Sequence, residues 1–334
     1  MTTFTHRWCI TCIALVTAAT SLPPHVCGAD AELRREFLKT YKKVYDDLIK
    51  NYTNIEYRAV RTADMQSIVQ IDEFEGKFNL TCQLHRNIGG QMVEKNTNKV
   101  LARFDKATIA AANSKYVFEV TPKDDGYLLS DFENTAIGKR VHMFDLILSP
   151  IVDWSMSRTY KAIAEDPETE FVSIQDEEQR GVPVKRVSVV VSEMDWSTNS
   201  RVRVKKNYFF RPDQGWICCG CTAVWPTDES KYVEEVYEYD GNESYPPLKG
   251  MIRTVRDART HAAVGMVTKT EVTTFKRGVK LTESECRLTA FGLPEPRGVS
   301  WSRTPWYLWL ALAGIIFLLA GRAFYWLKRR RQAA

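Results

Sequence analysis

The hydrophobic pattern of this chain changes its period along the sequence. From Ala31 to Ile49, apolar residues recur every three or four positions opposite a charged face, which predicts an amphipathic helix. From Ile55 onward apolar and polar residues mostly alternate, a period typical of half-buried antiparallel strands. We expect strands near residues 55–60, 67–71, 76–84, 100–104, 114–120, 126–130, 171–175, 184–191, 201–210, 216–225, 231–239, 249–255, 265–275 and 281–288.

The most regular alternation lies in residues 76–84. It predicts one strand whose core-facing side chains are Phe78, Leu80, Cys82 and Leu84. Two further tracts predict turns, because glycine and proline favour turn conformations. They are Gly89-Gly90 and Pro212-Asp213-Gln214-Gly215.

Residues 141–164 form the one other stretch with helical periodicity, and Pro150 is expected to break or kink it. The short connections between the predicted strands favour antiparallel pairing. The fold class we expect is therefore α+β. It combines a large antiparallel sheet, a leading helix and an inner helix.

The C-terminal hydrophobic stretch is of a different kind. No charged residue occurs from Pro305 to Gly321, and the apolar run continues to Leu327. About 22 residues at about 1.5 Å each span about 33 Å, enough to cross a bilayer core. Aromatic residues at both ends and a basic tail are typical of a membrane span with that tail in the cytoplasm. The anchor residues we assign are Trp306, Tyr307, Trp309, Arg322, Trp326, Arg329, Arg330 and Arg331.

The N-terminus has the layout of a secretory signal peptide. Arg7 precedes an apolar run, which is followed by a small-residue site that ends at Ala29. Cleavage after Ala31 and a retained N-terminal anchor are the alternatives. We therefore expect a single-pass type I protein of the inner membrane, with its domain on the periplasmic or extracellular side. Its parts are a signal peptide (1–29), an extracytoplasmic domain (30–291), a stalk (292–304), a transmembrane helix (305–327) and a basic tail (328–334).

The net positive charge of the chain comes from its predicted ends. Seven of the 46 Lys and Arg residues lie outside residues 30–300, but none of the 41 Asp and Glu residues does. The domain is thus slightly acidic, and nothing in it suggests a surface for nucleic acid. The expected partners are the bilayer and a lipid or lipoprotein ligand.

Of eight cysteines, five remain after the predicted signal peptide. On a strand, Cys219 and Cys221 share a face from which Cys218 points away. Pairing of Cys219 or Cys221 with Cys82 or Cys286 on neighbouring strands is one interpretation, and simple packing is the other. We expect no metal site, because no second ligand pair stands at metal spacing.

No motif of a nucleophile, a metalloprotease helix or a phosphate-binding loop occurs, so we expect no enzyme and no cofactor. Aromatic residues are frequent in the strands. They can fill a core or line a ligand groove. The groove candidates are Phe78, Leu80, Tyr116, Phe118, Tyr208, Phe210, Trp216 and Trp225.

The order of these elements resembles the LolA-like fold of the LolA, LolB, LppX and RseB envelope proteins. The resemblance rests on the leading helix 31–49, the mid-chain stretch 141–164, the hairpin at 212–216, the strand 247–253 and the tract ending Glu283–Leu288. It implies a half-open antiparallel barrel whose concave face holds an apolar ligand beneath covering helices.

The C-terminus resembles that of membrane-anchored planctomycete surface proteins. Pro294-Glu295-Pro296 ahead of a span is also similar to a PEP-CTERM sorting signal, which leaves open whether the tail is retained or processed. The expected function is binding of a lipid or lipidated protein by a membrane-anchored domain. The alternative is a structural or sensing module of the envelope that binds another protein.

Overall fold

The computed structural model of the 334-residue chain describes residues 26–104, 107–134, 148–153, 156, 158–195, 200–299 and 313–322. The chain divides into two compact units, one ending at Leu293 and the other beginning at Pro294. In the second unit residues 313–322 are helical, and Ile315, Phe317 and Leu318 are exposed. Within the described ranges no helix is both long and apolar enough to cross a bilayer.

Most residues that carry the two targeting predictions lie outside the described part of the chain. This holds for residues 1–25 of the predicted signal peptide and for both ends of the predicted span. Of the assigned anchor residues, Arg322 lies at the end of the described helix. The remainder, Trp306, Tyr307, Trp309, Trp326, Arg329, Arg330 and Arg331, fall outside it.

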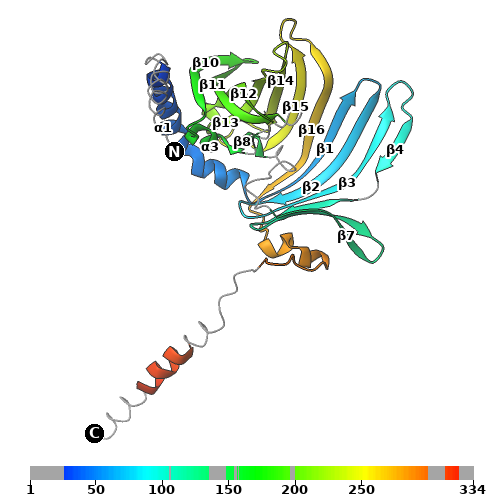
Figure 1. Cartoon of the computed structure of the whole chain (residues 1–334), viewed down its shortest axis with the longest axis vertical. Coiled ribbons are helices and arrows are strands. Elements are labelled where there is room, and N and C mark those ends of the chain that lie inside the picture. The colour runs from blue at the N-terminus through cyan, green and yellow to red at the C-terminus, as the bar shows by residue number, and fades with distance from the viewer. Residues whose placement is uncertain are drawn as a thin grey trace, which may run out of the picture. The chain divides into compact units, whose positions relative to one another are not determined.

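The first unit opens with helix α1 (Val26–Tyr52), which confirms the predicted leading helix. Its apolar stripe buries Phe37, Tyr41, Leu48 and Tyr52, while the opposite side meets solvent. The helix packs against strand β10 and the short helix α3 (Tyr160–Glu165), as Figure 1 shows. The apolar face of α1 is therefore covered by neighbouring elements, as an amphipathic helix requires.

A 14-stranded sheet forms the body of the unit, and each adjacent pair in it is antiparallel. The strand order is β10-β11-β12-β13-β14-β15-β16-β1-β2-β3-β5-β6-β7, with β4 paired to β3. The sheet is not closed, since β10 and β7 are its two ends (Figure 1). The predicted α+β class with a large, open antiparallel sheet is thus confirmed.

The strands are β1 (Ile55–Met65), β2 (Ile68–Phe78), β3 (Gln83–Glu94), β4 (Val100–Phe104), β5 (Ile109–Ala112), β6 (Val117–Lys123), β7 (Gly126–Glu133), β10 (Glu170–Gln179), β11 (Val182–Asp195), β12 (Ser200–Arg211), β13 (Ile217–Val224), β14 (Lys231–Tyr239), β15 (Leu248–Asp257) and β16 (Ala263–Arg277). A small separate ladder joins β8 (Val152–Asp153) to β9 (Arg158–Thr159).

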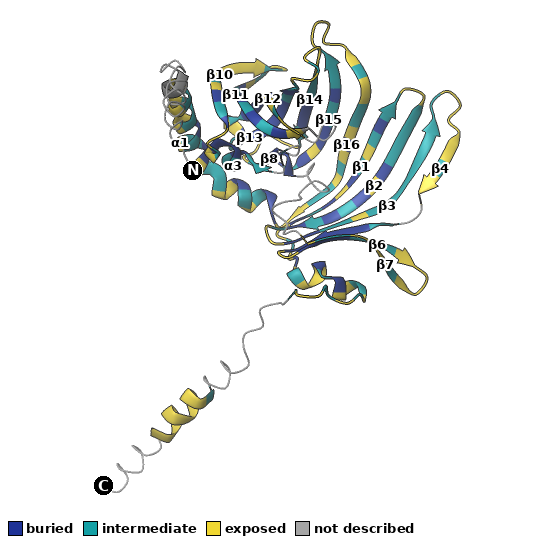
Figure 2. Ribbon diagram, in the orientation of Figure 1, coloured by how far each residue is buried: buried dark blue, intermediate teal, exposed yellow. Residues whose placement is uncertain are grey.

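The main core lies between the curved sheet and the elements that sit against it, which are α1, α3 and the β8–β9 ladder (Figure 2). Aromatic rings fill it. The ring centroids of Tyr160 and Tyr208 lie 5.0 Å apart, and those of Phe37 and Phe210 lie 5.5 Å apart. We call the side of the sheet that carries this core the core face.

The predicted helix over residues 141–164 is wrong for most of its described part. Leu148 and α3 are helical; residues 152–153 and 158–159 pair as strands, and residues 141–147 lie outside the described ranges. The backbone of Pro150 accepts a hydrogen bond from the Cys218 amide at 3.3 Å. Proline and this tertiary contact together favour an irregular path over the helical period.

The predicted strand 76–84 is also wrong, because a turn divides it. The Asn79 side-chain oxygen accepts hydrogen bonds from the amides of Thr81 and Cys82, both at 2.8 Å. This turn ends β2 and starts β3, and it leaves Leu80 59% exposed. Such side-chain capping of a turn is a common use of asparagine.

Two further predictions are corrected. Gly89-Gly90 is not a turn, since β3 runs through it. A Cβ on Gly90 would lie 2.8 Å from Asp72 Oδ1, so this glycine permits a close approach across the strands. The predicted strand 281–288 instead forms two 3₁₀ helices, η3 (Glu283–Cys286) and η4 (Leu288–Phe291).

Candidate functional site

The open half of the core face, on β16, β1, β2, β3 and β4, carries a row of residues fixed by strand register. Residues directly opposite one another in an antiparallel pair share a face. Thr270 lies opposite Arg61, Arg61 opposite Asp72, Asp72 opposite Gly90, and Gly90 opposite Phe104. We call these residues the polar row. Arg61 follows Ala59 on the same face of β1, so the polar row adjoins the apolar core.

At the Phe104 end of this row and beyond it, toward the hairpin ends, apolar side chains stand on the core face among polar ones such as Gln70, Glu94 and Thr268. Register and alternation bring five side chains to this area, which we call the apolar rim: Met65, Ile68, Met92, Phe104 and Met266. Phe104 is 42% exposed and Met266 is 47% exposed. Methionine adapts its shape to different partners, so a rim rich in methionine suits a flexible apolar ligand.

A hollow of about 650 Å³ lies over the polar row, and its lining includes Arg61, Gln70, Asp72, Arg103 and Phe104. The Asp72 carboxylate is buried and accepts two hydrogen bonds from Arg61, from Nη2 at 2.6 Å and from Nε at 3.1 Å. Gln70 Nε2 donates to Asp72 at 3.0 Å. The hollow therefore has an ordered polar floor, and Phe104 is the rim residue that lines it.

A second hollow, of about 450 Å³, is lined largely by charged side chains. They form ion pairs, with Arg86 at 3.5 Å from Glu75 and Lys276 at 2.9 Å from Glu56. Such exposed pairs are typical of a solvated sheet face. This hollow is more polar than the first.

The other half of the core face, which α1, α3 and the β8–β9 ladder cover, is called the closed half. A buried ion network takes the place of a hollow there. Lys206 Nζ lies 2.8 Å from Asp153 Oδ2 and also pairs with Glu193. The Tyr208 hydroxyl donates to the same Asp153 oxygen at 2.6 Å. Burial alone would lower the pKa of Lys206, but the two carboxylates outweigh it and hold that pKa above its usual range.

A neighbouring buried carboxylate, Glu235, accepts a hydrogen bond from the Tyr237 hydroxyl at 2.7 Å. Cys221 Sγ lies 3.5 Å from Glu235 Oε2, and Arg253 Nε lies 3.6 Å from Glu235 Oε1. Burial and the Glu235 charge both raise the pKa of Cys221. The sulfur is therefore a thiol at neutral pH and not a nucleophile.

The cysteine tract of β13 is arranged differently from the prediction. Cys218 and Cys221 belong to the main core, whereas Cys219 packs with Val184 and Phe209 in a separate cluster. The register shift between Phe209 and Phe210 provides the reason, because a bulge reverses the alternation. Among the described side chains, no three His, Cys, Asp or Glu residues converge to hold a metal ion.

The aromatic groove candidates do not lie together. Tyr208 and Phe210 are buried in the main core, where the Phe210 ring lies 6.1 Å from that of Trp216. Phe78 and Trp225 also belong to this core.

Tyr116 and Phe118 lie elsewhere. The Phe118 ring lies 5.5 Å from Phe291 of η4, and the Tyr116 hydroxyl accepts the amide hydrogen of Leu288. Leu80 sits in the exposed turn that follows β2.

The polar row and the apolar rim were not among the predicted site residues. Strand 55–60 was predicted to end before Arg61, although β1 continues to Met65. The signal in the sequence is that core-facing positions of β1 change from apolar Tyr57 and Ala59 to charged Arg61. A charge at a core-facing strand position marks where a core ends or a site begins.

No protein-family profile and no curated protein sequence matches the chain. Several solved structures do. A domain from Vibrio parahaemolyticus, described as an outer membrane lipoprotein-sorting protein, covers 76% of this chain and 98% of its own length at 10% identity, with a TM-score of 0.39. A DUF1329 family protein from Desulfovibrio piger covers 75% and 99% at 10% identity, with a TM-score of 0.40.

Lipoprotein LppX from Mycobacterium tuberculosis covers 76% of this chain and 100% of its own at 7% identity, with a TM-score of 0.28. The leading helix, the open antiparallel sheet and the short inner helix are the arrangement that the LolA-like resemblance implied. The likenesses are distant, and no residue role carries over from these structures.

Proposed function

We propose that this chain is a membrane-anchored extracytoplasmic protein that binds an apolar ligand, either a lipid or the acyl group of a lipidated protein. The polar end of the ligand lies in the hollow over the polar row, and its apolar part extends past Phe104 along the apolar rim. One observation carries the proposal. Large apolar side chains, including Phe104 and Met266, stay exposed on the same face that is fully packed elsewhere in the sheet.

The energetic basis is burial of acyl chain against the apolar rim. Each buried methylene contributes about 0.8 kcal/mol, so a chain segment of about eight methylenes supplies about 6 kcal/mol before ordering costs. A hollow of about 650 Å³ has the size of pockets that take such ligands. The Arg61–Asp72 pair supplies fixed polar groups at one end and thereby orients an amphiphile.

Two features support anchorage. Residues 305–321 are free of charge and precede a basic tail. The described helix 313–322 exposes Ile316, Phe317 and Leu318, and Phe317 is 78% exposed. Exposed side chains of this size are stable in contact with lipid. The signal-like N-terminus supports export of the domain.

The role is binding rather than catalysis. The strongly perturbed groups, such as Lys206 and Cys221, are buried away from the hollow, and each has a partner. They contribute to the core of the closed half. The floor of the hollow consists of groups that are already hydrogen-bonded to each other, which suits ligand orientation.

The second candidate function is binding of a protein partner at the sheet edge β7. β7 is the last strand in the sheet order, and it exposes Leu128 (56%) and Leu129 (39%). An edge strand offers unpaired backbone groups to a partner strand. This candidate is the envelope module that the sequence left as an alternative.

The test is retention of lipid by the full-length protein extracted in mild detergent from its membrane. Organic extraction and mass spectrometry measure moles of lipid per mole of protein. We expect near-stoichiometric retention by wild type, a several-fold loss in Phe104→Asp and no loss in the matched surface variant Leu128→Asp. Equal retention by all three proteins, or ligand-free wild type that also ignores added fatty acid, contradicts the proposal.

A further inference from the structure

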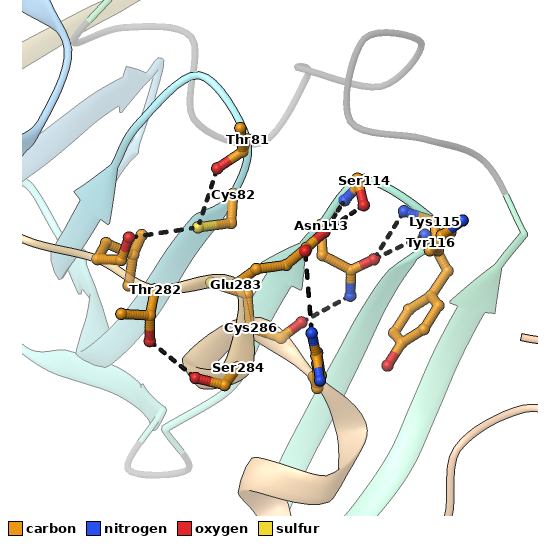
Figure 3. A network of polar contacts seen from close by, with 12 residues as sticks. Thr81, Cys82, Asn113, Ser114, Lys115, Tyr116, Thr282, Glu283, Ser284 and Cys286 are labelled. Carbon is orange, nitrogen blue, oxygen red and sulfur yellow. Dashed lines mark hydrogen bonds and ion pairs between the residues drawn. The ribbon is translucent and has the colours of Figure 1, made fainter. Parts of the chain in front are cut away.

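The last part of the first unit, residues 281–293, is held to the sheet without joining it. Leu281 accepts a hydrogen bond from Asn79 Nδ2 at 2.6 Å, and Cys286 accepts one from Asn113 Nδ2 at 2.7 Å. The amide of Ser114 donates to Glu283 Oε1 at 3.2 Å. These contacts come from the β2–β3 and β5–β6 turns, and Figure 3 shows how they converge. We call residues 281–293 the C-terminal clamp.

Two cysteines meet inside this clamp. Cys82 lies in the β2–β3 turn and Cys286 ends η3, and each side chain shifts the pKa of the other. Both residues are fully buried. Cys82 Sγ also lies 3.3 Å from Asn79 Oδ1 and 3.8 Å from the Leu281 carbonyl oxygen. The turn and the 3₁₀ helix thus bury two cysteine side chains together at the centre of the clamp.

We propose that Cys82 and Cys286 form a disulfide that locks the C-terminal clamp to the β2–β3 turn. The remaining cysteines do not compete for either sulfur. Cys218 and Cys221 face the main core, and Cys219 donates to the Phe209 carbonyl oxygen at 3.3 Å. One bond and three buried thiols then account for the odd cysteine number of the domain.

The chemistry is thiol–disulfide exchange with an external disulfide as oxidant. The Cys82 thiolate, after loss of its proton to solvent, attacks one sulfur of that disulfide, and the other sulfur leaves with the bonding electron pair as a thiolate. The Cys286 thiolate then attacks the Cys82 sulfur and expels the second thiolate. Two protein thiols and one disulfide become one protein disulfide and two thiols.

The two sulfurs differ in their readiness for this reaction. The interaction with Cys286 lowers the pKa of Cys82, although burial opposes it. The same interaction and burial raise the pKa of Cys286. A lower pKa favours the thiolate, so we assign the first attack to Cys82. Because both sulfurs are buried in the closed clamp, oxidation requires an open clamp, and the bond then prevents reopening.

The consequence concerns the end of the domain. Residues beyond the clamp continue toward the predicted span, so the clamp is the last folded part of the first unit. Side-chain hydrogen bonds of this kind contribute about 1 kcal/mol each and open individually. A covalent bond at Cys286 fixes the clamp against such local opening. This inference does not depend on what the hollow binds.

The direct test is disulfide mapping of the full-length protein. Purified protein is equilibrated with excess oxidised glutathione, acid-quenched, blocked with N-ethylmaleimide under denaturing conditions and digested. We expect a Cys82–Cys286 linked peptide that disappears on reduction, with Cys218, Cys219 and Cys221 alkylated. Alkylation of both Cys82 and Cys286, or a link from either one to Cys219 or Cys221, overturns the proposal.

A second test measures what the bond does. Urea unfolding of oxidised wild type is compared with and without dithiothreitol, and the reduced midpoint is expected to fall by on the order of 1 M. Cys82→Ser and Cys286→Ser should lose this response to reductant, and Cys219→Ser, the matched control, should keep it. Equal midpoints for oxidised and reduced wild type contradict a locking role even if the variants fail to fold.

Discussion

The ammonium of Lys206 lies 2.8 Å from the carboxylate of Asp153, and both side chains are only 2% exposed. β12 supplies the lysine, and the short strand β8 supplies the aspartate. Their contact ties the irregular segment inside the curve of the sheet to the sheet itself. A buried charge without a partner is costly, so this pair constrains where the segment can lie.

Removing the cation should therefore destabilise the domain strongly. Lys206→Met leaves Asp153 and Glu193 buried without their counter-charge, and we expect a loss of about 3–5 kcal/mol in the free energy of unfolding. The measurement is urea unfolding followed by tryptophan fluorescence. The matched control is Arg203→Met on the same strand, whose side chain is 64% exposed and pairs with Glu170. It should cost less than about 1 kcal/mol, and equal losses would refute the buried-pair account.

Stability should also fall as the pH is lowered through the range in which His85 titrates. The Tyr57 hydroxyl lies 3.0 Å from His85 Nδ1, and Phe74 packs on the same ring. Burial, together with the Arg61 charge, lowers the pKa of His85 to about 4. Between this value and its ordinary value near 6.5, the unfolded state binds more protons than the folded state, so acid favours unfolding.

The expected contribution of His85 is a loss of about 2 kcal/mol between pH 8 and pH 5. Urea midpoints at several pH values measure it. His85→Phe should remove this part of the pH dependence, whereas the exposed His261, replaced by Gln, should leave it in place. A pH profile for His85→Phe that parallels wild type would show that another group is responsible.

A methyl group at Gly76 should not be tolerated. A Cβ there would lie 2.6 Å from the Tyr57 hydroxyl oxygen and 2.8 Å from the Leu84 carbonyl oxygen. We expect Gly76→Ala to cost about 1–3 kcal/mol through overpacking. Gly126→Ala, where nothing lies within 4 Å of the added carbon, should be close to neutral. Thermal unfolding of both variants is the measurement, and similar melting temperatures would count against the packing of β1 on β2.

The division between β2 and β3 can be tested with two neighbouring side chains. Phe78 is 7% exposed and Leu80 is 59% exposed. Phe78→Ala should lose about 3–5 kcal/mol, but Leu80→Ala should change stability by less than about 0.5 kcal/mol. Comparable losses would mean that residues 76–84 do form the single alternating strand that their sequence pattern favours.

Much of the fold could be predicted because its strands keep a period of two over long runs. Strands such as β11 and β12 bury one face, and their alternating valines mark that face directly. The helix α1 has a 3.6-residue period for the same reason. These signals depend only on local sequence and one buried face, so neighbouring elements did not need to be known.

The errors have two other origins, which are a turn made by a local side chain and contacts between distant parts of the chain. The Asn79 side chain stabilises a turn by accepting a backbone hydrogen bond within it. Gly90, which has no Cβ, leaves room for the Asp72 carboxylate of the neighbouring strand. The bulge in β13 opposite Phe209 and Phe210 reverses the direction of Cys219. Alternation predicts none of these, because the first depends on a hydrogen-bonding side chain within the turn and the other two on a neighbouring strand.

The candidate site was missed for a related reason. Arg61, Asp72 and Phe104 are far apart along the chain and meet only through strand register. Register depends on which strands are neighbours and on where bulges occur. The predicted site consisted mostly of aromatic residues instead. Several of these, such as Tyr208, are packed in the main core and do not line the hollow.

The central claim is that acyl chain binds beside the polar row on the open half of the core face. The most direct measurement is photo-crosslinking of a diazirine-bearing fatty acid to the full-length protein, followed by peptide mapping. The account predicts labels on residues of β1, β3, β4 and β16 that include Met92, Phe104 and Met266, and competition by unlabelled fatty acid. Labelling confined to the predicted span, or to the β7 edge at Leu128 and Leu129, would contradict it.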